Sequence, residues 1–302
     1  MKMTNVIINF RRYLKRRNYS QHTVKYYLNI IKQFVLWLDV RLEQTTAKKI
    51  DAYIDYLHQK RMQPASINCY LAIIRIFYNY LKYEERIKLL NPVKTNCRLR
   101  VPRPLPRCLR EQEVEQLFSV IKNKRDFAMF KLMLRCGLRV EEVSNLTLGA
   151  VDLKRRRIIV CHGKGSKDRV VYISDDAYDA LVAYLNLRSH CRVKKVFLVG
   201  KGDYKGQPIS VRGIQKRMEY YAKKTGLTVS CHRLRHTMAT QLLNAEAAVE
   251  TIQDLLGHNW ITTTQRYCKI SNLKVQRDYF KAMRNVLQRS AHPSSSPVLE
   301  IG

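Results

Sequence analysis

Apolar residues recur at helical spacing throughout the first 85 residues of the chain. After Ser20, a residue type that favours a helix N-cap, apolar side chains follow one another three or four positions apart. The same pattern starts again after Thr46 and after Pro64, and a basic helix is expected near residues 4–17. The pattern predicts four helices that bury their apolar stripes against one another.

The later part of the chain combines helices with a short sheet. Residues 156–173 alternate between apolar and polar side chains around a Gly-Lys-Gly-Ser-Lys-Asp turn, which predicts an antiparallel hairpin. A third strand is expected at 195–199. Helices are expected at about 110–121, 125–135, 210–224, 232–244, 248–256 and 261–268. The predicted fold class is mainly α (α+β), with a small antiparallel β-sheet in the second domain.

These patterns divide the chain into four parts. We predict a helical domain over 1–85, a basic linker over 86–108, a second, larger domain over 109–290 and a tail over 291–302. Four of the eight prolines fall between residues 92 and 106, which favours an extended linker. Three consecutive serines flanked by prolines lie in the last part, so we expect the tail to be disordered.

Charge is the feature of composition that points to a partner. Lys and Arg number 56 against 24 Asp and Glu, which gives a net charge of +32. All charged residues before Asp39 are basic, and residues 86–110 contain no acidic one. A solvated surface does not need this asymmetry, whereas it suits binding to a polyanion such as DNA. The residues expected to contact DNA are Arg11, Arg12, Lys15, Arg16, Arg17, Lys25 and Lys32 on the helices, and Arg100, Arg103 and Arg107 in the linker.

Cysteine usage and hydropathy bear on the compartment. The eight cysteines form no Cys-x-x-Cys pair, and no apolar stretch reaches the roughly 18 residues of a membrane span. The N-terminus lacks the pattern of a signal peptide. Cys231 lies beside His232, but the spacing fits no zinc motif. We expect reduced thiols, no metal site, no membrane association and a cytoplasmic location.

Three short motifs in the second domain supply cations, imidazoles and a phenol. In order along the chain, they contain Arg139 and Glu142, then His232, Arg235 and His236, then His258 and Tyr267. No single tyrosine would be informative in a chain that has 18 of them. The signal lies in the order and the spacing of the motifs.

These residue types suit the cleavage of a phosphodiester. Guanidinium groups match phosphate oxygens in bidentate geometry and stabilise the charge that develops in the transition state. A tyrosine hydroxyl can act as the nucleophile when a neighbour accepts its proton. Gly137 suits the end of one helix, so Arg139 would begin the next. Glu142 would lie one turn further, where its carboxylate can hold the guanidinium; a simple surface pair is the alternative.

From about residue 4 to about residue 285, the chain resembles the tyrosine recombinase (integrase) family. The resemblance rests on the motifs above. It implies that Arg139 and Arg235 clamp the scissile phosphate and that Tyr267 forms a 3′-phosphotyrosyl bond. It also implies that His232 and His258 assist with protons and hydrogen bonds.

The family's lysine lies on the turn of a hairpin and matches Lys164 here, with Lys167 as the rival. A lysine on this turn can protonate the leaving oxygen. His236 is expected to orient its helix, although it could share in proton transfer. The chain departs from the family at Cys136, where Thr or Ser is common, and at Met238, where an aromatic residue is common. Neither departure touches the chemistry.

The resemblance implies a site-specific DNA recombinase that works as four copies on two duplexes through a Holliday junction. Because the phosphotyrosyl bond keeps the energy of the phosphodiester, no cofactor, ATP or metal is expected. The expected partners are double-stranded DNA with specific recombination sites and further copies of the chain. Accessory DNA-bending proteins, the target sequence, and the choice among integration or excision, transposition and chromosome-dimer resolution stay open.

Three other functions are compatible with parts of this pattern. A type IB topoisomerase uses the same chemistry on one duplex, but the helical first domain and the short chain favour a recombinase. A non-catalytic DNA-binding protein on the same fold would have no use for Tyr267 beside His258. A metal-dependent nuclease is the third alternative.

Apolar residues at helical spacing also mark the segment from Leu273 to about Leu287. The members of this stripe are Tyr279, Phe280, Met283, Val286 and Leu287. We expect the segment to dock on a neighbouring protomer, as the resemblance suggests, with packing on its own domain as the alternative.

Overall fold

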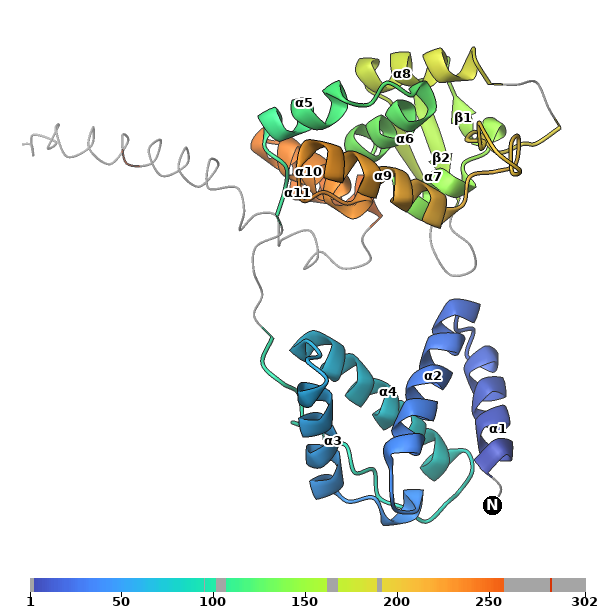
Figure 1. The fold of residues 1–302 in the computed structure, drawn as a ribbon, viewed down its shortest axis with the longest axis vertical. Helices are drawn as coiled ribbons and strands as arrows, with labels where there is room; N and C mark the ends of the chain where they lie inside the picture. Colours follow the sequence, from blue (N-terminus) through green and yellow to red (C-terminus); the bar gives the residue numbers. More distant parts are fainter. Residues whose placement is uncertain are drawn as a thin grey trace, which may run out of the picture. The chain divides into compact units, whose positions relative to one another are not determined.

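The computed structural model describes residues 3–94, 96–101, 107–161, 168–188, 192–257 and 283. The chain divides into two compact units, Met1–Arg103 and Pro104–Gly302 (Figure 1). Each unit has its own hydrophobic core. This is expected of a chain of 302 residues, which is long enough to build two cores.

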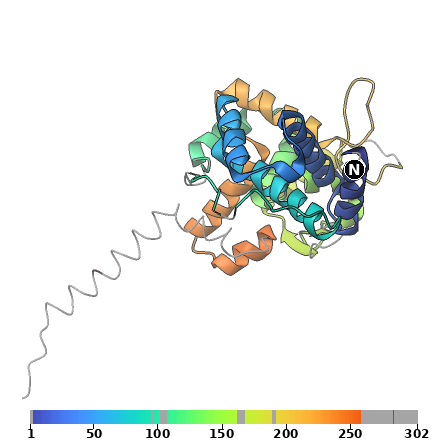
Figure 2. The same ribbon diagram turned by 90° about the horizontal axis from the view of Figure 1, so that it is seen from below.

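The described residues of the first unit form four α-helices, drawn in blue to teal in Figures 1 and 2. They are α1 (Met3–Arg16), α2 (Gln21–Trp37), α3 (Ala47–Gln59) and α4 (Pro64–Tyr83), with a 3-10 turn at Leu42–Gln44. Ser20 and Thr46 cap α2 and α3, because each hydroxyl accepts a hydrogen bond from a backbone N–H of the first turn. The prediction of four helices over this part of the chain is confirmed.

Aromatic side chains fill the core of the first unit. Phe10 of α1 lies edge-on against Phe77 of α4, and Phe34 of α2 lies edge-on against Tyr53 of α3, both with ring centroids 5.0 Å apart. All four rings are buried. One aromatic residue from each helix therefore ties the bundle together.

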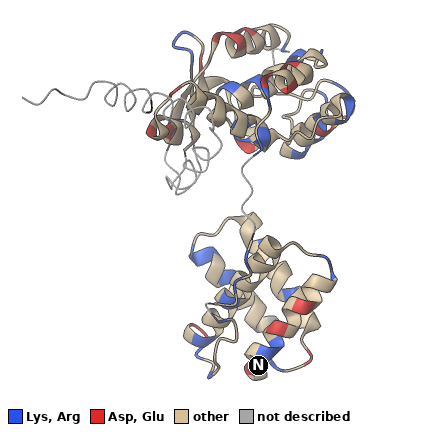
Figure 3. Ribbon diagram, turned by 90° about the vertical axis from the view of Figure 1, so that its left-hand side faces the viewer, with Lys and Arg blue, Asp and Glu red and all other residues tan. Residues whose placement is uncertain are grey.

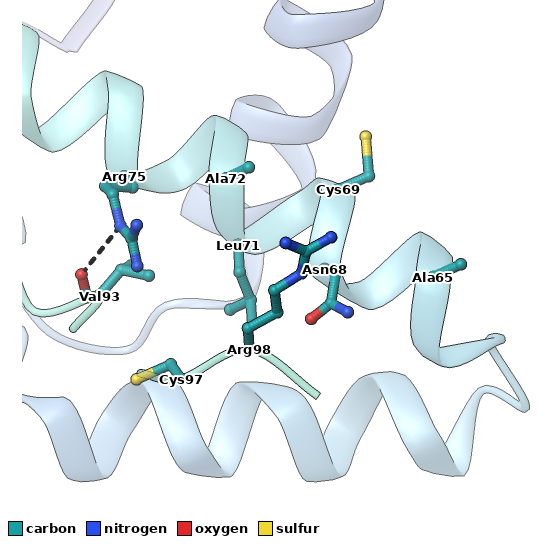
Figure 4. Close-up of a pocket in the computed structure, with 9 residues that line it drawn as sticks. All are labelled: Ala65, Asn68, Cys69, Leu71, Ala72, Arg75, Val93, Cys97 and Arg98. Atoms are coloured by element: carbon teal, nitrogen blue, oxygen red, sulfur yellow. Dashed lines mark hydrogen bonds between the residues drawn. The ribbon is translucent and has the colours of Figure 1, made fainter. Parts of the chain in front are cut away.

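The segment that follows α4 folds back along this helix. Asn68 makes two hydrogen bonds with the backbone of Leu99 (2.9 and 2.8 Å), and Arg75 Nε donates to the carbonyl of Val93 (3.2 Å). Figure 4 shows the pocket between α4 and the returning segment, which Asn68, Arg75 and Val93 help to line. This part of the predicted linker thus lies on the helical unit, while the exact bounds of the domains remain predictions.

The second unit combines helices with a small sheet (Figure 1). Its helices are α5 (Glu111–Ser119), α6 (Lys124–Arg135), α7 (Val140–Asn145), α8 (Asp175–Leu185), α9 (Val211–Thr225), α10 (Cys231–Asn244) and α11 (Val249–Leu256), with a 3-10 turn at Leu148–Ala150. Its strands are β1 (Val151–Asp152), β2 (Arg157–Val160) and β3 (Arg169–Tyr172). The predicted fold class, mainly helical with a small antiparallel sheet, is confirmed.

The sheet has the order β1-β2-β3, and both strand pairs are antiparallel. Ile158 pairs with Val171, and Val160 pairs with Arg169. These four residues are buried on the inner face, whereas their neighbours in sequence are more exposed. The predicted hairpin is therefore present, and its alternation places Arg169 among apolar side chains.

Two elements differ from the prediction. The third strand of the sheet is β1, and the strand expected at 195–199 was wrong: this segment makes only isolated bridges, Thr147 to Lys195 and Leu198 to Pro208. Val196, Phe197 and Leu198 are buried in the core without joining the sheet. Helix α8, which packs on α6, was not predicted. The helices expected at 261–268 and from Leu273, except for Met283, lie outside the described residues.

A buried carboxylate joins α6 to α9. Asp126 is 0% exposed and accepts hydrogen bonds from Arg125 Nη2 (2.7 Å), Arg217 Nε (2.6 Å) and the hydroxyl of Tyr221 (3.0 Å). A buried charge is stable only when its partners replace the lost water. Asp126 therefore fixes the contact between the two helices.

Replacing Asp126 with alanine should lower the free energy of unfolding of the second unit by about 3–5 kcal/mol, because its buried ion pairs would lose their anion. Urea unfolding followed by circular dichroism measures the change. Asp175→Ala is the matched control, since Asp175 is an exposed carboxylate paired with Arg156, and its loss should cost less than about 1 kcal/mol. Equal effects of the two substitutions would show that Asp126 does not hold α6 and α9 together.

Candidate active site at the end of α11

The turn between α6 and α7 sets the position of Arg139. Gly137 ends the α6 segment with φ +64°, a left-handed conformation that favours glycine. A Cβ at this position would lie 3.0 Å from Leu256 Cδ2 and 3.1 Å from Met238 Sδ. The close approach of α10 and α11 therefore also requires glycine, and Arg139 follows two residues later as the residue that precedes α7.

Glu142 holds Arg139 in two ways. The backbone N–H of Arg139 donates to Glu142 Oε2 (2.7 Å), and its Nη1 donates to Glu142 Oε1 (2.8 Å). The first bond caps α7, and the second fixes the guanidinium. The contact that the sequence suggested is present, and the supporting role of Glu142 in catalysis stays a prediction.

Three arginines converge on the last carbonyls of α11. Arg169 Nε donates to the carbonyl of Leu255 (2.8 Å), Arg235 Nη2 donates to that of Leu256, and Arg139 Nη2 donates to that of Gly257 (3.3 Å). The carbonyl end of a helix carries partial negative charge, so cations are stabilised there. Arg139 and Arg235, which are far apart in sequence, are thus brought to adjacent peptide groups.

The two guanidinium groups differ in exposure. Arg235 is 1% exposed and also donates to the carbonyl of Gly137, so it links the end of α6 to the end of α11. The side chain of Arg139 is 37% exposed. Arg139 is therefore the more accessible cation, and Arg235 is oriented by the surrounding backbone.

Two histidines of the site lie on the first turns of α10. The rings of His232 and His236 meet edge-to-face, with centroids 4.2 Å apart. Partial desolvation and then the charges of Arg235 and Arg139 lower the pKa of His232. The neutral imidazole is thus favoured near pH 7, which is the form that can accept a proton.

Arg169 is a residue of this site to which the sequence assigned no role. Its Nη1 and Nη2 donate to Glu142 Oε1 and Oε2, both at 2.8 Å, and it is 9% exposed. Burial alone would raise the pKa of Glu142, but hydrogen bonds from Arg169 and Arg139 lower it to about 2. A signal was available, because the strand alternation places Arg169 on the same face as Val171.

Some predicted site residues lie outside the described residues. They are Lys164, Lys167, His258, Tyr267 and Arg103, and their roles remain predictions. The described part of the site therefore comprises Arg139, Glu142, Arg169, His232, Arg235 and His236.

Figure 3 marks the lysines and arginines along both units, and those predicted to contact DNA are exposed where the structure describes them. The exposed ones are Arg11, Arg12, Lys15, Arg16, Arg17, Lys25, Lys32, Arg100 and Arg107. Over the described ranges, no cluster of His, Cys, Asp and Glu could hold a metal ion. No helix in the same ranges is long and apolar enough to cross a membrane.

Comparison with known proteins identifies the class. The phage integrase family profile matches residues 107–273, and the profile of the phage integrase N-terminal SAM-like domain matches residues 7–87. The chain is similar to tyrosine recombinase XerA of Thermococcus kodakarensis, with 33% identity over 268 residues that cover 88% of this chain and 91% of the relative. The chain belongs to the phage integrase family and is a tyrosine recombinase.

Solved structures share its fold. A crystal structure of XerA recombinase has 27% sequence identity and a TM-score of 0.54, with 92% of this chain and 98% of that chain covered. A lambda integrase tetramer bound to a Holliday junction has a TM-score of 0.70 at 17% identity, with 86% of this chain and 78% of that chain covered. The second likeness concerns the fold alone.

Gly137→Ala should destabilise the second unit by about 1–3 kcal/mol, because the new Cβ meets Leu256 and Met238 and the left-handed backbone disfavours alanine. It should also reduce DNA cleavage, since the displaced turn carries Arg139. Thermal unfolding and a cleavage assay measure the two effects. Gly149→Ala is the control, because its Cβ would meet nothing within 4 Å. A Gly137→Ala protein as stable and active as this control would contradict the assignment.

Proposed function

We propose that this tyrosine recombinase cleaves and rejoins DNA at specific sites through a 3′-phosphotyrosyl bond to Tyr267 and a Holliday junction. One observation carries the proposal: Arg139 and Arg235 reach adjacent carbonyls at the end of α11, directly before His258 in the chain. Two fixed cations side by side suit the non-bridging oxygens of one phosphate. The order and spacing of the motifs then indicate Tyr267 as the nucleophile.

Each residue takes one part of the reaction. The hydroxyl oxygen of Tyr267 attacks phosphorus and its proton passes to His232, whose lowered pKa keeps the imidazole neutral. Arg139 and Arg235 stabilise the charge on the phosphate oxygens, with a further hydrogen bond from His258. The bond to the 5′ oxygen breaks, and Lys164 protonates this leaving group. Rejoining is the same sequence in reverse, so no ATP is consumed.

The basic first unit supplies the grip on DNA. Its exposed lysines and arginines on α1 and α2 can neutralise phosphates along a duplex, and the chain as a whole carries a net charge of +32. Assembly as four copies on two DNA sites is supported by the shared fold with the lambda integrase tetramer on a Holliday junction. Such contacts position the protein and do not by themselves identify the target sequence.

The Tyr267→Phe protein should bind its DNA site with near-native affinity and form no covalent adduct, because only the nucleophilic hydroxyl is removed. A site is obtained by selecting duplexes from a randomised pool with the wild-type protein. A nicked form of that duplex then traps the adduct, and a gel-shift assay measures binding. Adduct formation by the variant would move the role to another residue, such as Tyr279.

Further outcomes separate the alternatives. A wild-type protein that binds the duplex but neither cleaves it nor forms an adduct would be a non-catalytic DNA-binding protein. Cleavage that gives no adduct and is lost in EDTA would identify a metal-dependent nuclease. Relaxation of supercoils without exchange between paired sites would identify a type IB topoisomerase.

Lys164→Ala should cleave slowly on ordinary DNA and regain most of the rate on DNA with sulfur in place of the 5′ leaving oxygen, because a thiolate leaves without protonation. Single-turnover cleavage of both substrates measures the effect, with Lys167→Ala as the matched control on the same turn. Rescue of Lys167→Ala in place of Lys164→Ala would show that Lys167 is the general acid.

A further inference from the structure

The guanidinium of Arg169 is the point at which three elements of the second unit meet. It belongs to the first residue of β3, it contacts Glu142 of α7 through two hydrogen bonds, and its Nε binds the carbonyl of Leu255 in α11. A Cβ on Gly257 would lie 3.0 Å from Arg169 Cδ. The side chain is therefore tightly enclosed by α7 and the end of α11.

We propose that Arg169 is a positioning residue for strand cleavage, which sets the orientation of Arg139 by occupying both oxygens of Glu142. This inference rests on the proposed function, in which Arg139 meets the scissile phosphate. Arg169 does not touch the DNA in this scheme. It acts through Glu142 and Arg139.

The hydrogen-bond geometry explains why a second arginine is needed. Arg139 makes one side-chain bond to Glu142, through Nη1, and its Nη2 turns to the carbonyl of Gly257. A carboxylate next to a single guanidinium favours a bidentate pair. Without Arg169, Glu142 would draw both Nη groups of Arg139 toward itself and away from the phosphate position.

The residues that make these contacts are also close in sequence to two further predicted catalytic residues. Arg169 follows Lys164 by five positions on the hairpin, and Gly257 directly precedes His258. Within the described residues, one buried side chain thus binds both the carboxylate that orients Arg139 and a carbonyl at the end of α11. A shift of Arg169 would displace Arg139 relative to the end of α11, and a misplacement of about 1 Å can reduce a rate roughly 100-fold.

The test compares Arg169→Gln and Arg169→Lys with Arg157→Gln. Arg157 is the matched control, because it lies on the neighbouring strand and its Nε contacts Asp152 (3.2 Å), away from Glu142. The measurement is the single-turnover rate of adduct formation on the selected, nicked duplex. A second duplex carries an uncharged methylphosphonate at the scissile position, which removes the charge that Arg139 would neutralise. Binding affinity and thermal unfolding are measured alongside.

We expect Arg169→Gln to slow cleavage about 100-fold with affinity changed less than about threefold. On the methylphosphonate duplex its deficit should shrink to about tenfold or less, because a misplaced Arg139 matters less there. Arg169→Lys keeps the charge and one contact, so its cleavage rate should fall less than that of Arg169→Gln. This reduction in rate should also be smaller on the methylphosphonate duplex than on the ordinary duplex. Arg169→Gln combined with Glu142→Gln should cleave faster than Arg169→Gln alone, because no carboxylate then captures Arg139.

Several results would overturn the proposal. These are an Arg169→Gln rate equal to that of Arg157→Gln, a deficit of the same size on both duplexes, or a double variant no faster than the single one. If Arg169→Gln does not fold, Arg169→Lys replaces it in the test. A rate deficit of Arg169→Lys that is equally large on both duplexes would then overturn the proposal. Failure of the wild-type protein to form any adduct would refute the proposed function itself, which is a separate outcome.

Discussion

Glu142 is a carboxylate taken out of water between two guanidinium groups, and the arrangement of the site follows from how its charge is balanced. Burial opposes ionisation, yet hydrogen bonds from Arg169 and Arg139 bring its pKa to about 2. A carboxyl whose folded pKa is lowered contributes its stability above its ordinary pKa of about 4.3 and loses it as the pH falls towards 2. The contact is therefore complete throughout the neutral range, and Arg139 keeps one orientation there.

The end of α11 shows how a helix terminus can assemble residues from distant parts of a chain. The last carbonyls of a helix have no partner within the helix itself. Arginines from the α6–α7 turn, from β3 and from α10 satisfy these carbonyls, and in return the carbonyls fix the guanidinium groups. Gly137 and Gly257 both have positive φ, which lets the backbone approach closely enough for these bonds. The chain therefore forms the site from backbone geometry as much as from side chains.

Most of the fold could be predicted from the sequence, because its helices carry apolar residues at regular spacing and begin at residues such as Ser20 and Thr46. Helix α8 was missed because its buried face rests largely on Ala177 and Ala180, a weak apolar signal, although Leu181 and Tyr184 complete it. The apolar pattern at 195–199 predicts a strand wrongly, because a buried segment without strand partners gives the same short apolar pattern as a strand.

The motifs predicted Arg139 and Arg235 as neighbours, and the structure brings them together. The bond between Arg169 and Glu142 could not be predicted in this way, because it joins residues 27 positions apart on different elements. The alternation along β3 places Arg169 on the inner face of the sheet, but it does not identify the residue that Arg169 contacts.

Charged residues act differently on the protein surface and in the buried site. The exposed basic residues of α1 and α2 face the solvent, where salt screens them, whereas the pairs around Glu142 are shielded from it. Affinity for DNA is thus open to modulation by salt, while the geometry of the buried site stays constant.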